Sequence, residues 1–193
     1  MSKVKIEGNA SGTGTLTIAA PNTNTDRTLT LPDGAGEILT DASDITSQAM
    51  NGPAFGAKMS ATQTFSANTW TKLAFNQEDF DTDSCYDTSN YRFTPTVAGY
   101  YQVTACGRIY ATATNPNGIN LGVYKNGSEE AIAQSYVVSQ QVQAGLSMAR
   151  LIYLNGTTDY IEAYCYLYGG SGTLGINGDR TASWFTAALM RAA

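Results

Sequence analysis

The stretch GYYQVTACGRIY, residues 99–110, decides the fold because its side chains alternate between two kinds. Successive side chains of a β-strand point to opposite faces, so alternate residues share a face. One set is mostly apolar or small: Tyr101, Val103, Ala105, Gly107 and Ile109. The other set is more polar: Tyr100, Gln102, Thr104, Cys106, Arg108 and Tyr110. This period of two predicts a long strand with one buried face.

The same alternation recurs along the chain. In Trp70–Phe75 it predicts that Leu73 and Phe75 point inward, and in Trp184–Arg191 it gives Phe185, Ala187 and Leu189 one common face. Residues 161–167 contribute another apolar side: Ile161, Ala163, Cys165 and Leu167. The opposite side carries Tyr160, Glu162, Tyr164, Tyr166 and Tyr168.

Turn signals separate these strands. Asn-Gly pairs favour the left-handed conformation of tight hairpins, and the head has them at Asn117-Gly118, Asn126-Gly127, Asn155-Gly156 and Asn177-Gly178. No comparable helical period is present. Many strands at short spacing with such turns predict an all-β sandwich or barrel.

Composition excludes several classes of function. The chain has 193 residues and no histidine, which removes Ser-His-Asp and Cys-His catalysis and histidine-bearing zinc sites. A net charge of −5 argues against a nucleic-acid partner, which needs clustered Lys and Arg. No apolar run reaches the roughly 18 residues of a membrane span, so no membrane insertion is expected. Three cysteines make a disulfide scaffold improbable and fit assembly in a reducing cytoplasm.

Aromatic residues first appear at Phe55, which suggests three parts. Residues 1–41 form a Thr- and Gly-rich segment with short period-two strands, residues 42–52 a linker with a short helix around 45–50, and residues 53–193 a head. The first segment has little to bury alone and is expected to anchor the chain on another protein. Its alternating apolar positions are the expected anchor residues: Leu16, Ile18, Leu29 and Leu31.

The head resembles the jelly roll of the complement C1q and TNF superfamily. Phe93–Val103 is similar to that family's approach to a central strand, Leu151–Ile161 to its hairpin of two late strands, and Ser183–Met190 to its closing strand. The resemblance implies a jelly-roll β-sandwich that forms a homotrimer around a three-fold axis. Tyrosines suit such an interface, and the expected interface residues are Tyr100, Tyr101, Tyr110, Tyr153 and Trp184.

The N-terminal segment resembles short modules of phage fibre and virion proteins, through Gly12–Ile18, Pro21–Asn24 and Arg27–Gly36. There is no collagen-like stalk. The resemblance implies a trimeric virion protein of fibre, spike or head-decoration type, assembled in the host cytoplasm and displayed on the virion surface. The anchor would dock on other capsid or tail proteins, and the head would serve attachment to a host-surface glycan. The alternatives are a capsid decoration protein that stabilises the shell and a carbohydrate-active enzyme.

Candidate sites on the head are few. Tyr164, Tyr166 and Tyr168 with Glu162 form a candidate ligand face, since aromatic rings and a carboxylate suit sugars. Asp79, Asp81 and Asp83 alternate and offer oxygen ligands for calcium, but no EF-hand glycine or closing glutamate follows. Glu129 and Glu130 are adjacent, so in a strand they point apart and do not form a catalytic pair. We therefore expect no catalytic residues, no cofactor and no enzyme.

Overall fold

The computed structural model describes residues 11–13, 24, 52–113, 116–136 and 144–193. The chain divides into two compact units, Met1–Ile38 and Leu39–Ala193, and the features below belong to the second. The predicted N-terminal strands, the linker helix and the anchor residues lie outside the described residues: Leu16, Ile18, Leu29 and Leu31. Their predictions therefore stay predictions.

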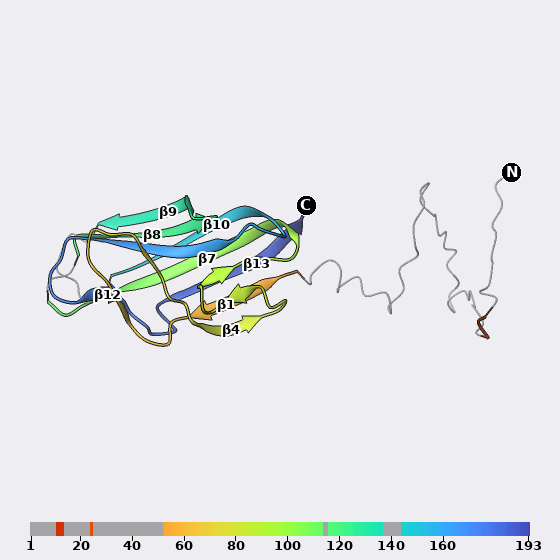
Figure 1. The fold of residues 1–193 in the computed structure, drawn as a ribbon, viewed down its shortest axis with the longest axis horizontal. Coiled ribbons are helices and arrows are strands. Elements are labelled where there is room, and N and C mark those ends of the chain that lie inside the picture. The colour runs from red at the N-terminus through yellow and green to blue at the C-terminus, as the bar shows by residue number, and fades with distance from the viewer. Residues whose placement is uncertain (1–10, 14–23, 25–51, 114–115, 137–143) are drawn as a thin grey trace. The chain divides into compact units, whose positions relative to one another are not determined.

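The second unit is a jelly-roll β-sandwich of two antiparallel sheets (Figure 1). The strands of the larger sheet are β1 (Ala54–Lys58), β2 (Gln63–Thr64), β4 (Gln77–Asp81), β7 (Ala98–Ala111), β10 (Gly145–Asn155), β12 (Leu174–Ile176) and β13 (Trp184–Ala192). The strands of the smaller sheet are β3 (Thr71–Lys72), β5 (Tyr86–Asp87), β6 (Arg92–Phe93), β8 (Gly118–Lys125), β9 (Ser128–Tyr136) and β11 (Ile161–Tyr168). The predicted all-β fold class is confirmed.

The long strand β7 organises the larger sheet. It pairs with β10 along one edge, and with β13 and then β12 along the other. β1 and β4 extend the sheet beyond β13, and β2 extends it beyond β12. In the smaller sheet β11 pairs with β8, which pairs with β9, while β3 and β6 lie on the other side of β11.

The core lies between the sheets and confirms the predicted alternation. The residues predicted to point inward are buried, apart from Leu189, which packs against the core while partly exposed. Phe55 is central, because its ring stacks on Tyr86 and Phe93 at 4.5 and 4.6 Å and meets Phe185 edge-on at 5.1 Å. The strand predicted at Trp70–Phe75 shrinks to β3, because Gln63 Oε1 accepts the Ala74 amide at 2.8 Å in place of a strand partner.

Two local expectations were wrong. Only Asn126-Gly127, with φ of +53° and +78°, closes a two-residue hairpin, between β8 and β9. The predicted hairpin over Leu151–Ile161 does not form, because β10 pairs with β7 in one sheet and β11 with β8 in the other. Asn155 Oδ1 instead accepts three successive amides, from Thr157 to Asp159, and turns the chain from one sheet to the other.

The described part of the head begins and ends at one end of the sandwich. The Leu189 amide donates to the Pro53 carbonyl at 3.1 Å, and the Ala193 amide donates to the Ala98 carbonyl at 3.0 Å. Figure 1 shows the C-terminus at this end and β12 toward the other. The described residues contain no helix long and apolar enough to cross a membrane.

The crossing after β10 gives a first prediction. Gly156 has φ of +72°, and a Cβ there would lie 2.3 Å from the Ala98 nitrogen. Gly156→Ala should lower the free energy of unfolding by at least about 2 kcal/mol, from a left-handed alanine plus a backbone clash. The measurement is urea unfolding of the full chain.

Gly145→Ala is the matched control for this substitution. A Cβ at position 145 meets nothing nearer than 3.6 Å. Its unfolding free energy should change by less than about 0.5 kcal/mol. Equal losses of unfolding free energy for both variants would contradict the path assigned to the chain between β10 and β11.

Candidate functional site

Each sheet buries one face against the other and leaves its second face outward. The outer face of the smaller sheet carries a row of rings, which we call the aromatic face: Trp70, Tyr124, Tyr136, Tyr164, Tyr166 and Tyr168. The three tyrosines of β11 come from the sequence-predicted ligand face. The structure brings them together with rings from β8, β9 and the segment before β3.

The rings of the aromatic face form a continuous series. Trp70 lies at its centre, 5.7 Å from Tyr124 and 5.6 Å from Tyr166 between ring centroids. Tyr124 continues to Tyr164 at 4.2 Å, and Tyr166 continues to Tyr168 at 4.7 Å. Gly122 makes this possible, because a Cβ there would lie 3.3 Å from the Trp70 ring. The indole therefore lies directly over the backbone of β8.

Amide side chains occupy one end of the aromatic face. The Tyr168 hydroxyl accepts hydrogen bonds from Asn120 Nδ2 at 2.9 Å and from Gln134 Nε2 at 3.0 Å. Gln134 Nε2 also donates to the Tyr136 hydroxyl at 3.2 Å. Asn120 is 8% exposed, and its Oδ1 has no hydrogen-bond partner in the part of the chain that the structure describes. This end thus combines rings, hydroxyls and a buried acceptor.

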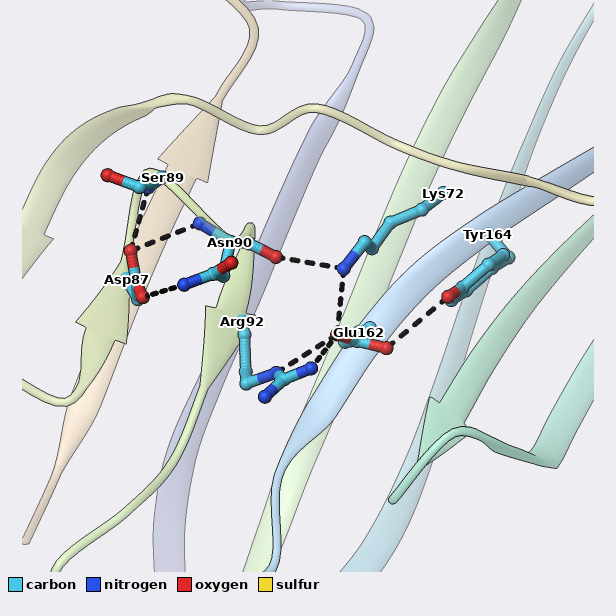
Figure 2. A network of polar contacts seen from close by, with 7 residues as sticks. All are labelled: Lys72, Asp87, Ser89, Asn90, Arg92, Glu162 and Tyr164. Carbon is cyan, nitrogen blue, oxygen red and sulfur yellow. Dashed lines mark hydrogen bonds and ion pairs between the residues drawn. The ribbon is translucent and has the colours of Figure 1, made fainter.

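Glu162 was predicted on the ligand face, and the structure corrects this. Its side chain is 2% exposed, and its carboxylate is held by two cations (Figure 2). Oε1 accepts from Lys72 Nζ at 2.9 Å and from Arg92 Nε and Nη2 at 3.0 and 2.8 Å. A buried carboxylate needs such partners to offset its lost hydration. Glu162 therefore joins β3, β6 and β11 and does not face a ligand.

The charges around Glu162 balance. Lys72 Nζ also donates to the Asn90 carbonyl, and Asp87 accepts from Asn90 Nδ2 at 2.6 Å in the same network (Figure 2). The Arg92 guanidinium stacks on the Tyr160 ring at 3.7 Å. Two cations and two carboxylates thus form a neutral network on the outer side of β11, beside the Tyr164 end of the aromatic face. Burial raises the pKa of the Tyr164 phenol, and the Glu162 charge adds to this shift.

The outer face of the larger sheet, which we call the interface face, is poor in charge. Its central rows across β10, β7 and β13 contain no charged side chain: Ser147, Cys106 and Trp184; Ala149, Thr104 and Thr186; Leu151, Gln102 and Ala188. Apolar side chains stand exposed on or beside these rows: Tyr100, Leu151, Tyr153 and Met190. Exposed apolar side chains on an uncharged sheet face make it a candidate interaction surface.

The predicted trimer-interface residues separate into two groups. Tyr100, Tyr110, Tyr153 and Trp184 lie outward on the larger sheet, and the rings of Tyr100 and Tyr153 are 5.5 Å apart. Tyr101 is a correction, because it is 0% exposed and packs edge-on against Phe93 in the core. Its hydroxyl donates to the Val97 carbonyl at 2.7 Å. A side chain without accessible surface is not available to a second copy.

The acidic run does not gather into a site. Asp79 pairs with Lys58. Asp81 Oδ2 accepts the Tyr86 amide at 2.8 Å, and Asp83 lies in the exposed turn that follows β4. Among the described residues, no three His, Cys, Asp or Glu side chains are placed to hold a metal ion together.

Catalytic arrangements are equally sparse in the described residues. Glu129 is exposed at the start of β9, while Glu130 turns toward Arg150 at 3.7 Å. A pocket of about 410 Å³ lies between Thr64–Ala67 and Gly170–Leu174, and none of its lining residues is titratable. The three cysteines are free, and burial raises the pKa of each thiol.

Sequence reasoning missed Trp70, Tyr124, Asn120 and Gln134 as parts of the aromatic face. The signal for two of them was available in residues 118–125, where Asn120, Gly122 and Tyr124 alternate with Ile119, Leu121 and Val123. Trp70 and Gln134 carried no such signal, because their places depend on which strands become neighbours.

Solved structures share the fold. The globular domain of zebrafish complement 1qA matches with a TM-score of 0.57 at 16% identity, over 74% of this chain and 100% of that domain. Murine APRIL matches with a TM-score of 0.56 at 7% identity, over 72% and 100%. The Eiger TNF of S. frugiperda matches with a TM-score of 0.56 at 10% identity, over 73% and 92%. The head therefore has the C1q and TNF jelly-roll fold.

Comparisons of the sequence alone identify no family. No family model matches the chain, and no curated protein matches it.

The Glu162 network gives a second prediction. Glu162→Gln should lower the free energy of unfolding by about 2–3 kcal/mol, because two cations lose their shared carboxylate while remaining partly hydrated. Glu130→Gln is the control, since its pair with Arg150 is exposed, and should cost less than about 1 kcal/mol. Urea unfolding measures both, and equal losses would argue against a supporting role for Glu162.

Proposed function

We propose that this chain is a homotrimeric structural protein of a phage particle, whose jelly-roll head is displayed for attachment to a glycan-bearing host surface. The interface face carries this proposal. Leu151 is 52% and Met190 65% exposed beside rows without charge. Association of copies would remove this surface from water.

Three copies are the number that the fold favours. The head has the C1q and TNF jelly-roll fold, and the resemblance in sequence implies jelly rolls around a three-fold axis. A closed ring of this kind is heterologous, so each copy offers two different surfaces. Tyr100 and Tyr153, whose rings lie 5.5 Å apart beside Leu151, would supply aromatic area on one of them.

The virion role rests on the N-terminal segment. Gly12–Ile18 and Arg27–Gly36 resemble modules of phage fibre and virion proteins, and a segment with so little to bury suits docking on a capsid or tail protein. Many trimers on one particle would bind a surface by avidity, without strong individual contacts. No catalytic step belongs to this function.

A capsid decoration protein is the second candidate. The uncharged interface face, with its exposed Leu151 and Met190, would equally suit contact with a capsid surface. The aromatic face favours attachment, because a purely cementing role gives no reason to display stacked rings opposite the interface face.

The assembly gives a third prediction. Light scattering should report three times the 20.5 kDa chain mass for the full chain. Leu151→Asp should shift this mass toward the monomer, because it places a charge on the exposed apolar part of the interface face. Ser128→Asp adds the same charge on the hairpin of the smaller sheet and should leave the mass unchanged. A monomeric unsubstituted chain would overturn the trimer.

The location gives a fourth prediction. Antibodies against the head should label purified phage particles in electron micrographs. Labelled tails support attachment, and labelled capsid three-fold positions support decoration instead. Purified particles that lack the protein would refute the virion role.

A further inference from the structure

We propose that the aromatic face is a binding site for uncharged pyranose glycans, in which Trp70 and Tyr166 stack on sugar rings and the amide end contacts their hydroxyls. This inference rests on the proposed function and names the ligand class that the head would recognise. Four features of the face carry it: its shape, its charge, its polar groups and an unpaired acceptor.

The shape of the aromatic face suits stacking. Trp70 and Tyr166 are partly exposed, and their ring centroids are 5.6 Å apart at the centre of the series. Pyranose rings present a face of C–H groups, which packs on aromatic rings as other apolar groups do. Trp70 is held over Gly122 and against Tyr124 at 5.7 Å, so its ring is placed before a ligand arrives. Little entropy is then lost on binding.

The charge of the aromatic face disfavours ionic ligands. Lys72 and Arg92 both pair with the Glu162 carboxylate, so a sugar acid would have to compete with it for their charge. Glu129 lies at the Tyr124 end, where its charge adds to burial in raising the pKa of the Tyr124 phenol. An anionic polysaccharide would meet this carboxylate and a chain with a net charge of −5. An uncharged glycan meets neither penalty.

The polar groups at the amide end suit hydroxyl recognition. Gln134 shares one amide nitrogen between the hydroxyls of Tyr136 and Tyr168. Asn120 leaves Oδ1 buried and unpaired beside them, within the described residues. An unpaired buried acceptor is unfavourable, and a sugar hydroxyl inserted at Tyr168 would satisfy it. A bound sugar would therefore add a hydrogen bond at this end of the face.

The test is electrophoresis of the intact full-length trimer through native gels that contain a polysaccharide. The uncharged probes are a β-glucan, a galactomannan and a mannan, and alginate is the anionic probe. At least one uncharged probe should retard the trimer, and alginate should not. Trp70→Ala and Tyr166→Ala should each weaken retardation about tenfold, which is one lost stacking contact. Trp70→Phe keeps a ring and should recover part of the loss.

Two further variants separate binding from folding. Phe80→Ala removes an exposed ring of the larger sheet and should bind as the unsubstituted trimer does. Asn120→Ala should weaken retardation, because it removes the acceptor offered to a sugar hydroxyl, whatever the lost bond to Tyr168 does to the urea midpoint. A purely structural Asn120 would lower the midpoint and leave retardation unchanged.

Three results would overturn the glycan site: a trimer that no uncharged probe retards, retardation that survives both Trp70→Ala and Tyr166→Ala, or retardation by alginate alone. None of them refutes the trimer or the virion role, whose own failure appears as a monomeric mass or as absence from particles.

Discussion

The contact on which the head depends is the stacking of Phe55 against rings from both sheets. Its partners Tyr86 and Phe93 belong to β5 and β6 of the smaller sheet, while Phe185 comes from β13 of the larger one. Tyr86 also donates its hydroxyl to the Phe75 carbonyl at 2.7 Å, so burial of the phenol leaves no polar group unpaired. The sheets are thereby held face to face, and their inner faces are buried against one another.

Burial of the inner faces leaves two outer faces, which differ in chemistry. The interface face is built from small, uncharged and apolar side chains, which suits contact with another protein surface. The aromatic face adjoins the neutral network around Glu162, which ties three strands together beside Tyr164. Assembly and recognition can therefore occupy opposite sides of one thin sandwich. Neither has to compromise the packing of the core.

Alternation along single strands was enough to predict which residues of β7, β11 and β13 point inward, because strand geometry fixes it. Tyr101 was misplaced at the interface although its own alternation puts it in the core. Glu162 was misplaced because its partners Lys72 and Arg92 lie 90 and 70 residues away. The place of Trp70 over Gly122 depends in the same way on strand neighbours. Pairing between distant strands is a property of the whole fold, which no local pattern contains.

The head's two ends of chain lie together, with Pro53 bonded to Leu189 and Ala98 to Ala193. This closeness makes the sandwich suitable for circular permutation. A short linker from Ala193 to Gly52 would close the backbone without crossing either outer face. New termini could then be opened among the glycines that precede β12, toward the far end (Figure 1). Fused to another protein through these new termini, the permuted head would point its opposite end toward that protein.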